Sequence, residues 1–169
     1  VQGSLSLNVS SFVGDTKASC SGGTYFDEDG DSQSNSQVAW FKNGNVEKNG
    51  TSIDISQTSI SKGDKVKCGK RYHDGNQWGS WVYTDELTVQ DTPPSIDITI
   101  SPSNPMPSDD LSCAYTNYSD LDGDSLTSKS LEWTYDGSTL NSSSGTKVGL
   151  ANSQVDNNKI YECYIELQQ

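Results

Sequence analysis

Two five-residue segments concentrate carboxylates in a pattern that could bind a metal ion. Each reads Asp-x-Asp-Gly-Asp, and the aspartates are Asp27, Asp29, Asp31, Asp120, Asp122 and Asp124. Alternate carboxylates beside a glycine, which lets the chain bend, can converge on a hard cation such as Ca²⁺. A full EF-hand loop would also need a glutamate at its twelfth position, and neither segment has one. The sequence therefore predicts calcium at these carboxylates, with a solvated acidic turn as the alternative.

An aromatic segment could bind a ligand by stacking. Residues 71–83 read RYHDGNQWGSWVY, and the candidate binding residues are Tyr72, Trp78 and Trp81. Exposed aromatic rings on a β-surface can stack on sugars or anchor a protein partner. The alternative, which we prefer, makes the two tryptophans packing residues at the end of the fold or at a domain joint.

The chain has no recognisable catalytic pattern. His73 is the only histidine, and no Ser or Cys nucleophile lies near it in a known motif. No two carboxylates are spaced in a way that marks them as the acid and base of a glycosidase. We therefore expect a protein that is not an enzyme.

The charge balance restricts the partners. Eleven Lys and Arg residues against 23 Asp and Glu residues give a net charge of −12. Such a surface repels phosphate backbones, so we expect no nucleic acid partner. No apolar run is long enough to span a membrane. Glycosylation sequons begin at Asn8, Asn49, Asn117 and Asn141. Since about three would arise by chance in so Ser- and Thr-rich a chain, they decide nothing.

The four cysteines indicate disulfides. They are Cys20, Cys68, Cys113 and Cys163, and none has the close spacing of a zinc site. Four cysteines allow three pairings, which their number and spacing alone do not decide. Disulfides form in oxidising compartments, so we expect an extracellular or cell-surface protein.

An internal repeat organises the chain. An offset of 93 residues places Cys20 on Cys113 and Trp40 on Trp133, so that Cys-x6-Asp-x-Asp-Gly-Asp-x8-Trp occurs twice without a gap. We therefore expect two tandem domains, residues 1–92 and 93–169. Pro93-Pro94 joins them, and two prolines in series make a short, stiff linker.

The alternation of apolar and polar residues in both repeats predicts β-strands. Apolar residues alternate with polar ones along 5–9, 96–100, 131–135 and 161–167, while no segment has a helical period. Asn43-Gly44 predicts a type I′ hairpin turn, and Asp136-Gly137 stands in the same place in the second repeat. Short strands separated by frequent turn signals favour an all-β sandwich.

The order Cys…Trp…Cys narrows the sandwich to the immunoglobulin-like type. In that fold a cysteine of strand B bonds one of strand F across the sheets, and a strand-C tryptophan packs on the bridge. The pairs would then be Cys20–Cys68 around Trp40 and Cys113–Cys163 around Trp133. Tyr161, two residues before Cys163, occupies the place of a tyrosine corner.

These features resemble the tandem immunoglobulin-like repeats of archaeal and bacterial surface proteins. The matching stretches include Thr92-Pro93-Pro94-Ser95, Ile100-Ser101-Pro102, Leu111-Ser112-Cys113, the Asp-rich loops and Lys67-Cys68. The resemblance covers nearly the whole chain. It implies an extracellular setting in a stalk, fibre or spacer, and it is weak for molecular function, because fold does not fix function.

The second domain is expected to lack its last strand. After Cys68 the first repeat continues to a plausible strand G ending near Val89, whereas only six residues follow Cys163. The chain could be cut from a longer array, the domain could tolerate an open edge, or a neighbour could insert a strand.

The leading functional hypothesis is an extracellular structural protein. It would be a subunit of a filament, a pilus-like fibre or a surface stalk, associating head to tail, with residues 5–9 as one candidate donor strand. The alternative is an adhesin, a glycan- or protein-binding module that uses the hairpin of Trp78 and Trp81.

Overall fold

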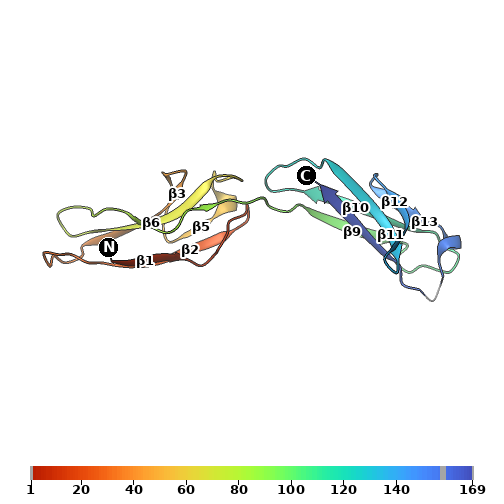
Figure 1. Cartoon of the computed structure of the whole chain (residues 1–169), viewed down its shortest axis with the longest axis horizontal. Coiled ribbons are helices and arrows are strands. Elements are labelled where there is room, and N and C mark those ends of the chain that lie inside the picture. Colours follow the sequence, from red (N-terminus) through yellow and green to blue (C-terminus); the bar gives the residue numbers. More distant parts are fainter. Residues whose placement is uncertain (1, 157–158, 169) are drawn as a thin grey trace. The chain divides into compact units, whose positions relative to one another are not determined.

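The computed structural model describes residues 2–156 and 159–168, and these form β-strands and two short 3₁₀ turns (Figure 1). The chain divides into two compact units, Val1–Thr92 and Pro93–Gln169. Each unit has two antiparallel sheets, so the fold is all-β, with two tandem immunoglobulin-like sandwich domains. Within the described ranges, no helix has the length and hydropathy needed to cross a bilayer.

Unit 1 is built from a three-stranded and a five-stranded sheet. The first has the order β1-β2-β5: β1 (Gln2–Leu7), β2 (Lys17–Thr24) and β5 (Ser52–Asp54), with the 3₁₀ turn η1 (Ile55–Gln57) after β5. The second has the order β4-β3-β6-β7, with β8 also on β6: β3 (Asn35–Lys42), β4 (Asn45–Asn49), β6 (Lys65–His73), β7 (Val82–Tyr83) and β8 (Leu87–Thr88). Strand β6 is therefore paired along both of its edges.

Within the described residues, unit 2 repeats this plan without counterparts of β7 and β8. One sheet has the order β13-β10-β9: β9 (Ser95–Ser101), β10 (Leu111–Ser119) and β13 (Lys147–Leu150). The other has the order β12-β11-β14: β11 (Ser128–Tyr135), β12 (Ser138–Ser143) and β14 (Glu162–Gln168), with η2 (Asn152–Gln154) after β13. In the part of the chain that is described, no strand pairs with the second edge of β14.

One disulfide joins the two sheets of each unit. Cys20 of β2 is bonded to Cys68 of β6, with a Cα–Cα distance of 6.3 Å. Cys113 of β10 is bonded to Cys163 of β14, at 6.4 Å. These are the pairs that the order Cys…Trp…Cys indicated. Each bridge closes a long loop and so stabilises its unit by about 3–4 kcal/mol.

A fully buried tryptophan stands beside each bridge. Trp40 and Trp133 are 0% and 1% exposed, and each lies opposite the second cysteine of its unit in the strand register. The two indoles differ in one hydrogen bond. Trp133 Nε1 donates to the Val148 carbonyl at 3.2 Å, whereas the buried Nε1 of Trp40 has no partner. Phe12 packs edge-on against Trp40, at 6.2 Å between ring centres.

The hairpin turns follow the prediction from Asn-Gly. Asn43 and Gly44 have φ values of 49° and 84°. Asp136 and Gly137 have 49° and 72°. Two successive residues with positive φ make a type I′ turn, whose twist matches that of the flanking strands. The prediction at Asn43-Gly44 is confirmed, and the second repeat uses the same device.

The two tryptophans make a matched pair for mutation. Trp133→Phe should lower the free energy of unfolding of its unit by about 1 kcal/mol more than Trp40→Phe does, because only Trp133 loses a hydrogen bond. The volume removed is the same in both variants. Denaturant unfolding of the full chain, followed separately for each unit by NMR, gives the two losses. Equal losses would show that the Val148 contact contributes nothing.

Candidate functional site

The acidic loop of unit 1 is closed by hydrogen bonds to its first aspartate. One oxygen of Asp27, Oδ1, accepts the backbone N–H groups of Asp29 and Asp31, each at 3.0 Å. Gly30 has a φ of +85°, which a residue with a side chain rarely adopts. The Tyr25 hydroxyl donates to the Asp31 carbonyl at 2.9 Å and completes the loop. Desolvation and the nearby carboxylates, first Asp27, raise the pKa of Tyr25.

Unit 2 contains the same loop. Asp120 Oδ1 accepts the N–H groups of Asp122 and Asp124, both at 2.9 Å, and Tyr118 donates to the Asp124 carbonyl at 3.1 Å. Gly123 has a φ of +78°. Across residues 2–156 and 159–168, no group of three or more acidic, His or Cys side chains is close enough to hold a metal ion. The first aspartate of each loop thus has a structural role, and calcium binding stays a prediction.

Asp27→Asn distinguishes the role of this carboxyl group as a hydrogen-bond acceptor from its predicted role as a calcium ligand. The amide keeps an acceptor oxygen for the two N–H groups but loses the charge, so we expect the melting temperature without calcium to stay nearly unchanged. Asp27→Ala removes the acceptor and should cost about 1 kcal/mol. Melting is measured with Ca²⁺ and with a chelator. A wild-type melting temperature that does not respond to chelator would count against the calcium prediction.

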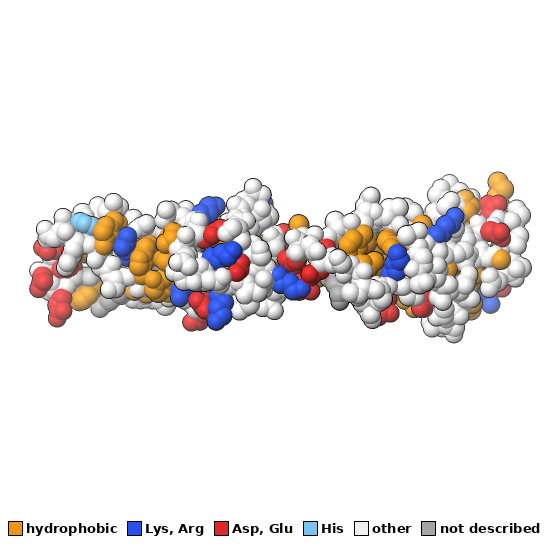
Figure 2. All heavy atoms as spheres, turned by 90° about the horizontal axis from the view of Figure 1, so that it is seen from above, with side chains coloured by type: hydrophobic (Ala, Val, Ile, Leu, Met, Phe, Trp, Pro, Cys, Tyr) orange, Lys and Arg blue, Asp and Glu red, His pale blue; other side chains and the backbone are white. Residues whose placement is uncertain are grey.

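The tryptophans of the aromatic segment lie on the outer face of the β6 sheet. The Arg71 guanidinium carbon is 4.6 Å from the ring centres of both Trp78 and Trp81, within the range of cation–π attraction. Nε and Nη2 of Arg71 also donate to Gln37 Oε1, at 2.9 and 2.7 Å. Figure 2 shows hydrophobic side chains around a basic one, close to the histidine, which is His73.

Gly69 leaves room for further aromatic rings on the outer face of the sheet, next to the tryptophans. A side chain at Gly69 would come within 2.9 Å of Phe41 and Tyr83, so these rings cover its backbone. Phe41 lies 5.2 Å, ring centre to ring centre, from both Trp81 and Tyr83. Lys67 then lies 4.7 Å from the centre of the Tyr83 ring. We call Lys67, Gly69, Arg71 and the rings of Phe41, Trp78, Trp81 and Tyr83 the aromatic ladder.

Tyr72 does not join the tryptophans. It is 8% exposed, its hydroxyl donates to the Gly23 carbonyl at 2.9 Å, and its ring meets that of Tyr25 edge-on. Successive side chains of a strand point to opposite faces, so Tyr72 lies on the face opposite to Arg71. The structure therefore brings together two of the three predicted binding residues, and it places Tyr72 in the packing of unit 1.

Arg71→Met should lower the free energy of unfolding of unit 1 by about 1–2 kcal/mol, because it removes two cation–π contacts and a charge-assisted pair of hydrogen bonds. Arg71→Lys keeps the charge without the planar group and should recover only part of the loss. Tryptophan fluorescence during denaturant unfolding reports both variants. A loss below about 0.3 kcal/mol for Arg71→Met would contradict a stabilising ladder.

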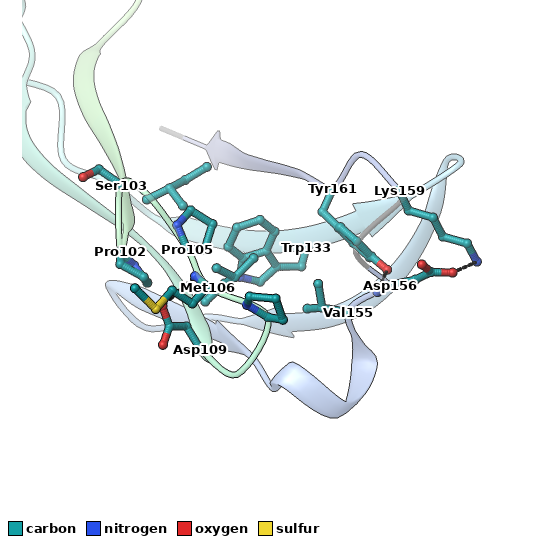
Figure 3. Close-up of a pocket in the computed structure, with 13 residues that line it drawn as sticks. Pro102, Ser103, Pro105, Met106, Asp109, Trp133, Val155, Asp156, Lys159 and Tyr161 are labelled. Atoms are coloured by element: carbon teal, nitrogen blue, oxygen red, sulfur yellow. Dashed lines mark hydrogen bonds and ion pairs between the residues drawn. The ribbon is translucent and has the colours of Figure 1, made fainter.

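Unit 2 contains an apolar groove between the segment that follows β9 and the residues that precede β14 (Figure 3). Its volume is about 650 Å³. The hydrophobic lining residues are Ile100, Pro102, Pro105, Met106, Pro107, Leu111, Trp133, Val155 and Tyr161. Met106 is 70% exposed and Ile100 46%, so the groove presents apolar surface to solvent.

The wall of the groove is fixed by a tyrosine corner. The Tyr161 hydroxyl accepts the N–H of Asp156 at 2.7 Å and donates to the Gln154 carbonyl at 3.3 Å. This confirms the corner predicted at Tyr161. At the same end, Lys159 forms an ion pair with Asp156, with 3.9 Å between Nζ and Oδ2, and its ammonium lies over the Tyr135 ring. The groove is thus bordered by a fixed aromatic wall.

In unit 1 the last strand fills the corresponding place. Val89 is 2% exposed, its N–H donates to the Asp64 carbonyl at 2.8 Å, and it forms a parallel bridge with Phe12. Pro105 is the counterpart of Phe12, because it follows Ile100 by five positions, as Phe12 follows Leu7. Lys159 is the counterpart of Asp64, because each stands four positions before the second cysteine of its unit. Pro105 and Lys159 both line the groove. The groove therefore lies where Val89 lies in unit 1.

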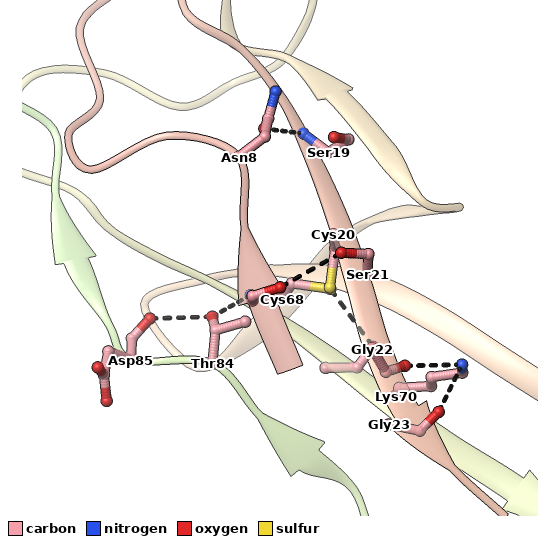
Figure 4. Close-up of a disulfide and its surroundings, with 12 residues drawn as sticks. Asn8, Ser19, Cys20, Ser21, Gly22, Gly23, Cys68, Lys70, Thr84 and Asp85 are labelled. Carbon is pink, nitrogen blue, oxygen red and sulfur yellow. Dashed lines mark hydrogen bonds between the residues drawn. A yellow bond between two sulfur atoms is a disulfide. The ribbon is translucent and has the colours of Figure 1, made fainter. Parts of the chain in front are cut away.

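The backbone hydrogen bonds of Cys68 show along which edge of β6 the last segment of unit 1 pairs. In unit 1 the N–H of Cys68 donates to Thr84 Oγ1 at 3.1 Å, and its carbonyl accepts from the Thr84 N–H at 2.9 Å (Figure 4). Trp133 pairs with Cys163 in the same register as Trp40 with Cys68. The polar backbone groups of Cys163 therefore face the open edge of β14.

Several functional features carried little sequence signal. The closure of the acidic loops by Tyr25 and Tyr118 could have been found, because these tyrosines share the offset of 93 residues. The missing last strand was expected from the sequence, but the apolar lining of the groove could not be found, because residues 100–111 and 155–161 come together only in the folded unit. The role of Lys67 and Arg71 in the ladder also depends on strand register rather than on local sequence.

Comparisons with known proteins assign the chain to no family. No family model matches the chain, and no curated protein matches it. One solved structure to which it is similar comprises the three N-terminal domains of the Highly Immunogenic Outer Capsid protein (Hoc) of bacteriophage RB49. The identity is 13% and the TM-score 0.36, and the match covers 98% of this chain and 54% of the other. The chain thus spans about half the length of that structure, and its fold is assigned from its own topology.

Proposed function

We propose that this chain is a non-enzymatic structural protein of the cell surface. It serves as a subunit of a filament, pilus-like fibre or stalk built from immunoglobulin-like domains. A strand from a neighbouring subunit completes unit 2. One observation carries this proposal: the apolar groove and the one-sided pairing of β14 mark the place that the last strand fills in unit 1.

An extracellular setting is supported by the two disulfides. Each disulfide joins the two sheets of a unit with a small buried core. Such bridges persist in oxidising compartments. An open strand edge beside apolar surface is a template for pairing with another chain. Insertion of a strand is a head-to-tail contact, and repeated head-to-tail contacts build an open polymer when the rotation does not close a ring.

The ladder favours this function over the adhesin that uses Trp78 and Trp81. Both indole rings already contact Arg71, and Trp81 also packs on Phe41. A sugar stacking on Trp78 would have to compete with the guanidinium. The rings therefore contribute to the stability of unit 1, as packing residues do.

Met106→Glu tests the proposed assembly. Met106 is 70% exposed, so the fold should tolerate the change, while a charge in the groove should disfavour an apolar strand. We expect filaments to be lost or shortened in electron micrographs of the full-length protein, and sedimentation to shift toward the monomer.

Val46→Glu is the matched control. Val46 is 53% exposed in unit 1 and lies outside the groove, so the same change there should leave assembly intact. Native protein that is monomeric, with a continuation of its own chain closing β14, would overturn the filament.

A further inference from the structure

We propose that Asn8 carries an N-linked glycan whose first sugar lies in a polar pocket on the outer face of the sheet β1-β2-β5. Asn8-Val9-Ser10 is one of the four glycosylation sequons, which their number alone does not separate. Their surroundings in the folded chain do separate them. This inference goes beyond the proposed function, because it needs the extracellular setting but holds whether or not the protein forms a filament.

The side chain of Asn8 is held by its oxygen and not by its nitrogen (Figure 4). Oδ1 accepts the backbone N–H of Ser19 at 2.6 Å, and the Asn8 N–H donates to the Ser19 carbonyl at 3.2 Å. Within the described residues, Nδ2 makes no hydrogen bond. N-glycosylation modifies Nδ2 and leaves Oδ1 as an acceptor. A glycan can therefore be attached to Asn8 without the loss of either bond.

The rest of this sequon is also accessible. Asn8 and Ser10 are exposed in the segment that follows β1, while Val9 packs against the core and fixes the path of the chain. A sequon in a surface loop of a secreted protein is the usual acceptor of a glycan. The enzyme that transfers the glycan can thus reach both the asparagine and the serine that it recognises.

In the two sequons of unit 2 the fold uses the amide nitrogen. Asn117 Nδ2 donates to Asp97 Oδ2 at 2.7 Å, and Asn141 Nδ2 donates to the Gly149 carbonyl at 2.8 Å. One hydrogen remains on Nδ2 after glycosylation, but the sugar would then stand against the strand that carries the acceptor, β9 or β13. These two asparagines are therefore poorer acceptors than Asn8.

Asn49 is the closest rival of Asn8. Its Oδ1 accepts Gln37 Nε2 at 3.2 Å, so its nitrogen too is left out of the bonding. The two residues that follow it are bound to the sheets, however. The Gly50 N–H donates to a carbonyl of β3 at 2.9 Å, and the Thr51 carbonyl accepts an N–H of β2 at 2.8 Å. An enzyme that binds this sequon would have to break those bonds, which costs free energy.

Asn8 also borders a pocket of about 320 Å³, large enough for a sugar ring. The polar residues that line it with Asn8 are Lys17, Ser19, Lys48, Ser52 and Asp54. Ser19 and Ser52 are cross-strand partners, and their exposed hydroxyl groups make no hydrogen bond within the described residues. Lys17 and Asp54 form an ion pair at 3.5 Å beside them. Such donors and acceptors can bind the hydroxyl groups of a sugar.

The modification is a group transfer from a lipid-linked pyrophosphate donor of the glycan. A bond forms between Nδ2 of Asn8 and C1 of the first sugar, and the bond between C1 and the pyrophosphate oxygen breaks. Nδ2 loses one proton, and the lipid pyrophosphate leaves with the electron pair. The product is a bulky, solubilising group on the outer face of unit 1.

Mass spectrometry of peptides from the protein purified from its native cells tests the attachment. We expect sugar on Asn8 in most copies, and none on Asn117 or Asn141. Ser10→Ala should abolish the modification of Asn8, because it destroys the sequon, whereas Ser10→Thr, the matched control, should retain it. Asn8→Asp keeps the acceptor for the Ser19 N–H and removes the nitrogen, so it should lose the glycan and still fold.

An unmodified Asn8 in the native protein would overturn the proposal, and so would equal occupancy of Asn8, Asn117 and Asn141. A glycan on Asn49 without one on Asn8 would show that the pairing of the backbone does not select the site. The pocket is tested by NMR of the glycosylated protein. Nuclear Overhauser effects should connect the first sugar with the side chains of Ser19 and Ser52, and their absence would overturn the assignment of the pocket.

Discussion

The disulfide between the second and the sixth strand of each unit is the constraint on which the rest of the molecule depends. It joins the two sheets at a fixed point and sets a buried tryptophan opposite its second cysteine. Because side chains alternate along a strand, fixing one inward residue fixes the direction of all the others. The outward positions of β6 and β14 are therefore defined by Cys68 and Cys163. On those positions the two units carry different chemistry.

The two units share a frame and differ in how one sheet ends. Unit 1 covers the outer face of β6 with the ladder and closes its edge with β7 and β8. Unit 2 has Tyr164 where unit 1 has Gly69, so its outer face needs no ring from a further strand. An acidic edge and an apolar groove remain. Within the described residues, the strands that close the edge of β6 in unit 1 therefore have no counterpart beside β14 in unit 2.

The sequence predicted the elements that depend on local chemistry and on the repeat. The turn at Asn43-Gly44 was predictable because few residues adopt positive φ. The tyrosine corner at Tyr161 was predictable because its hydrogen bonds go to residues nearby in the sequence. The stacking role assigned to Tyr72 depended on the face of β6, which neighbouring residues alone do not reveal. The lining of the groove was not predictable from sequence, since residues 100–111, Trp133 and residues 155–161 meet only in the folded unit. The closure of each acidic loop was missed although its tyrosine repeats in register.

The edge of β14 with which no described strand pairs is also a hazard while the protein folds. Two such edges could pair with each other and start uncontrolled aggregation. Antiparallel pairing of two copies of β14 would bring Glu162 and Glu166 of one chain close to those of the other. Charged residues at these positions act as gatekeepers, because they penalise the pairing of like with like. Glu162 and Glu166 thus disfavour the pairing of this edge with a second copy of itself.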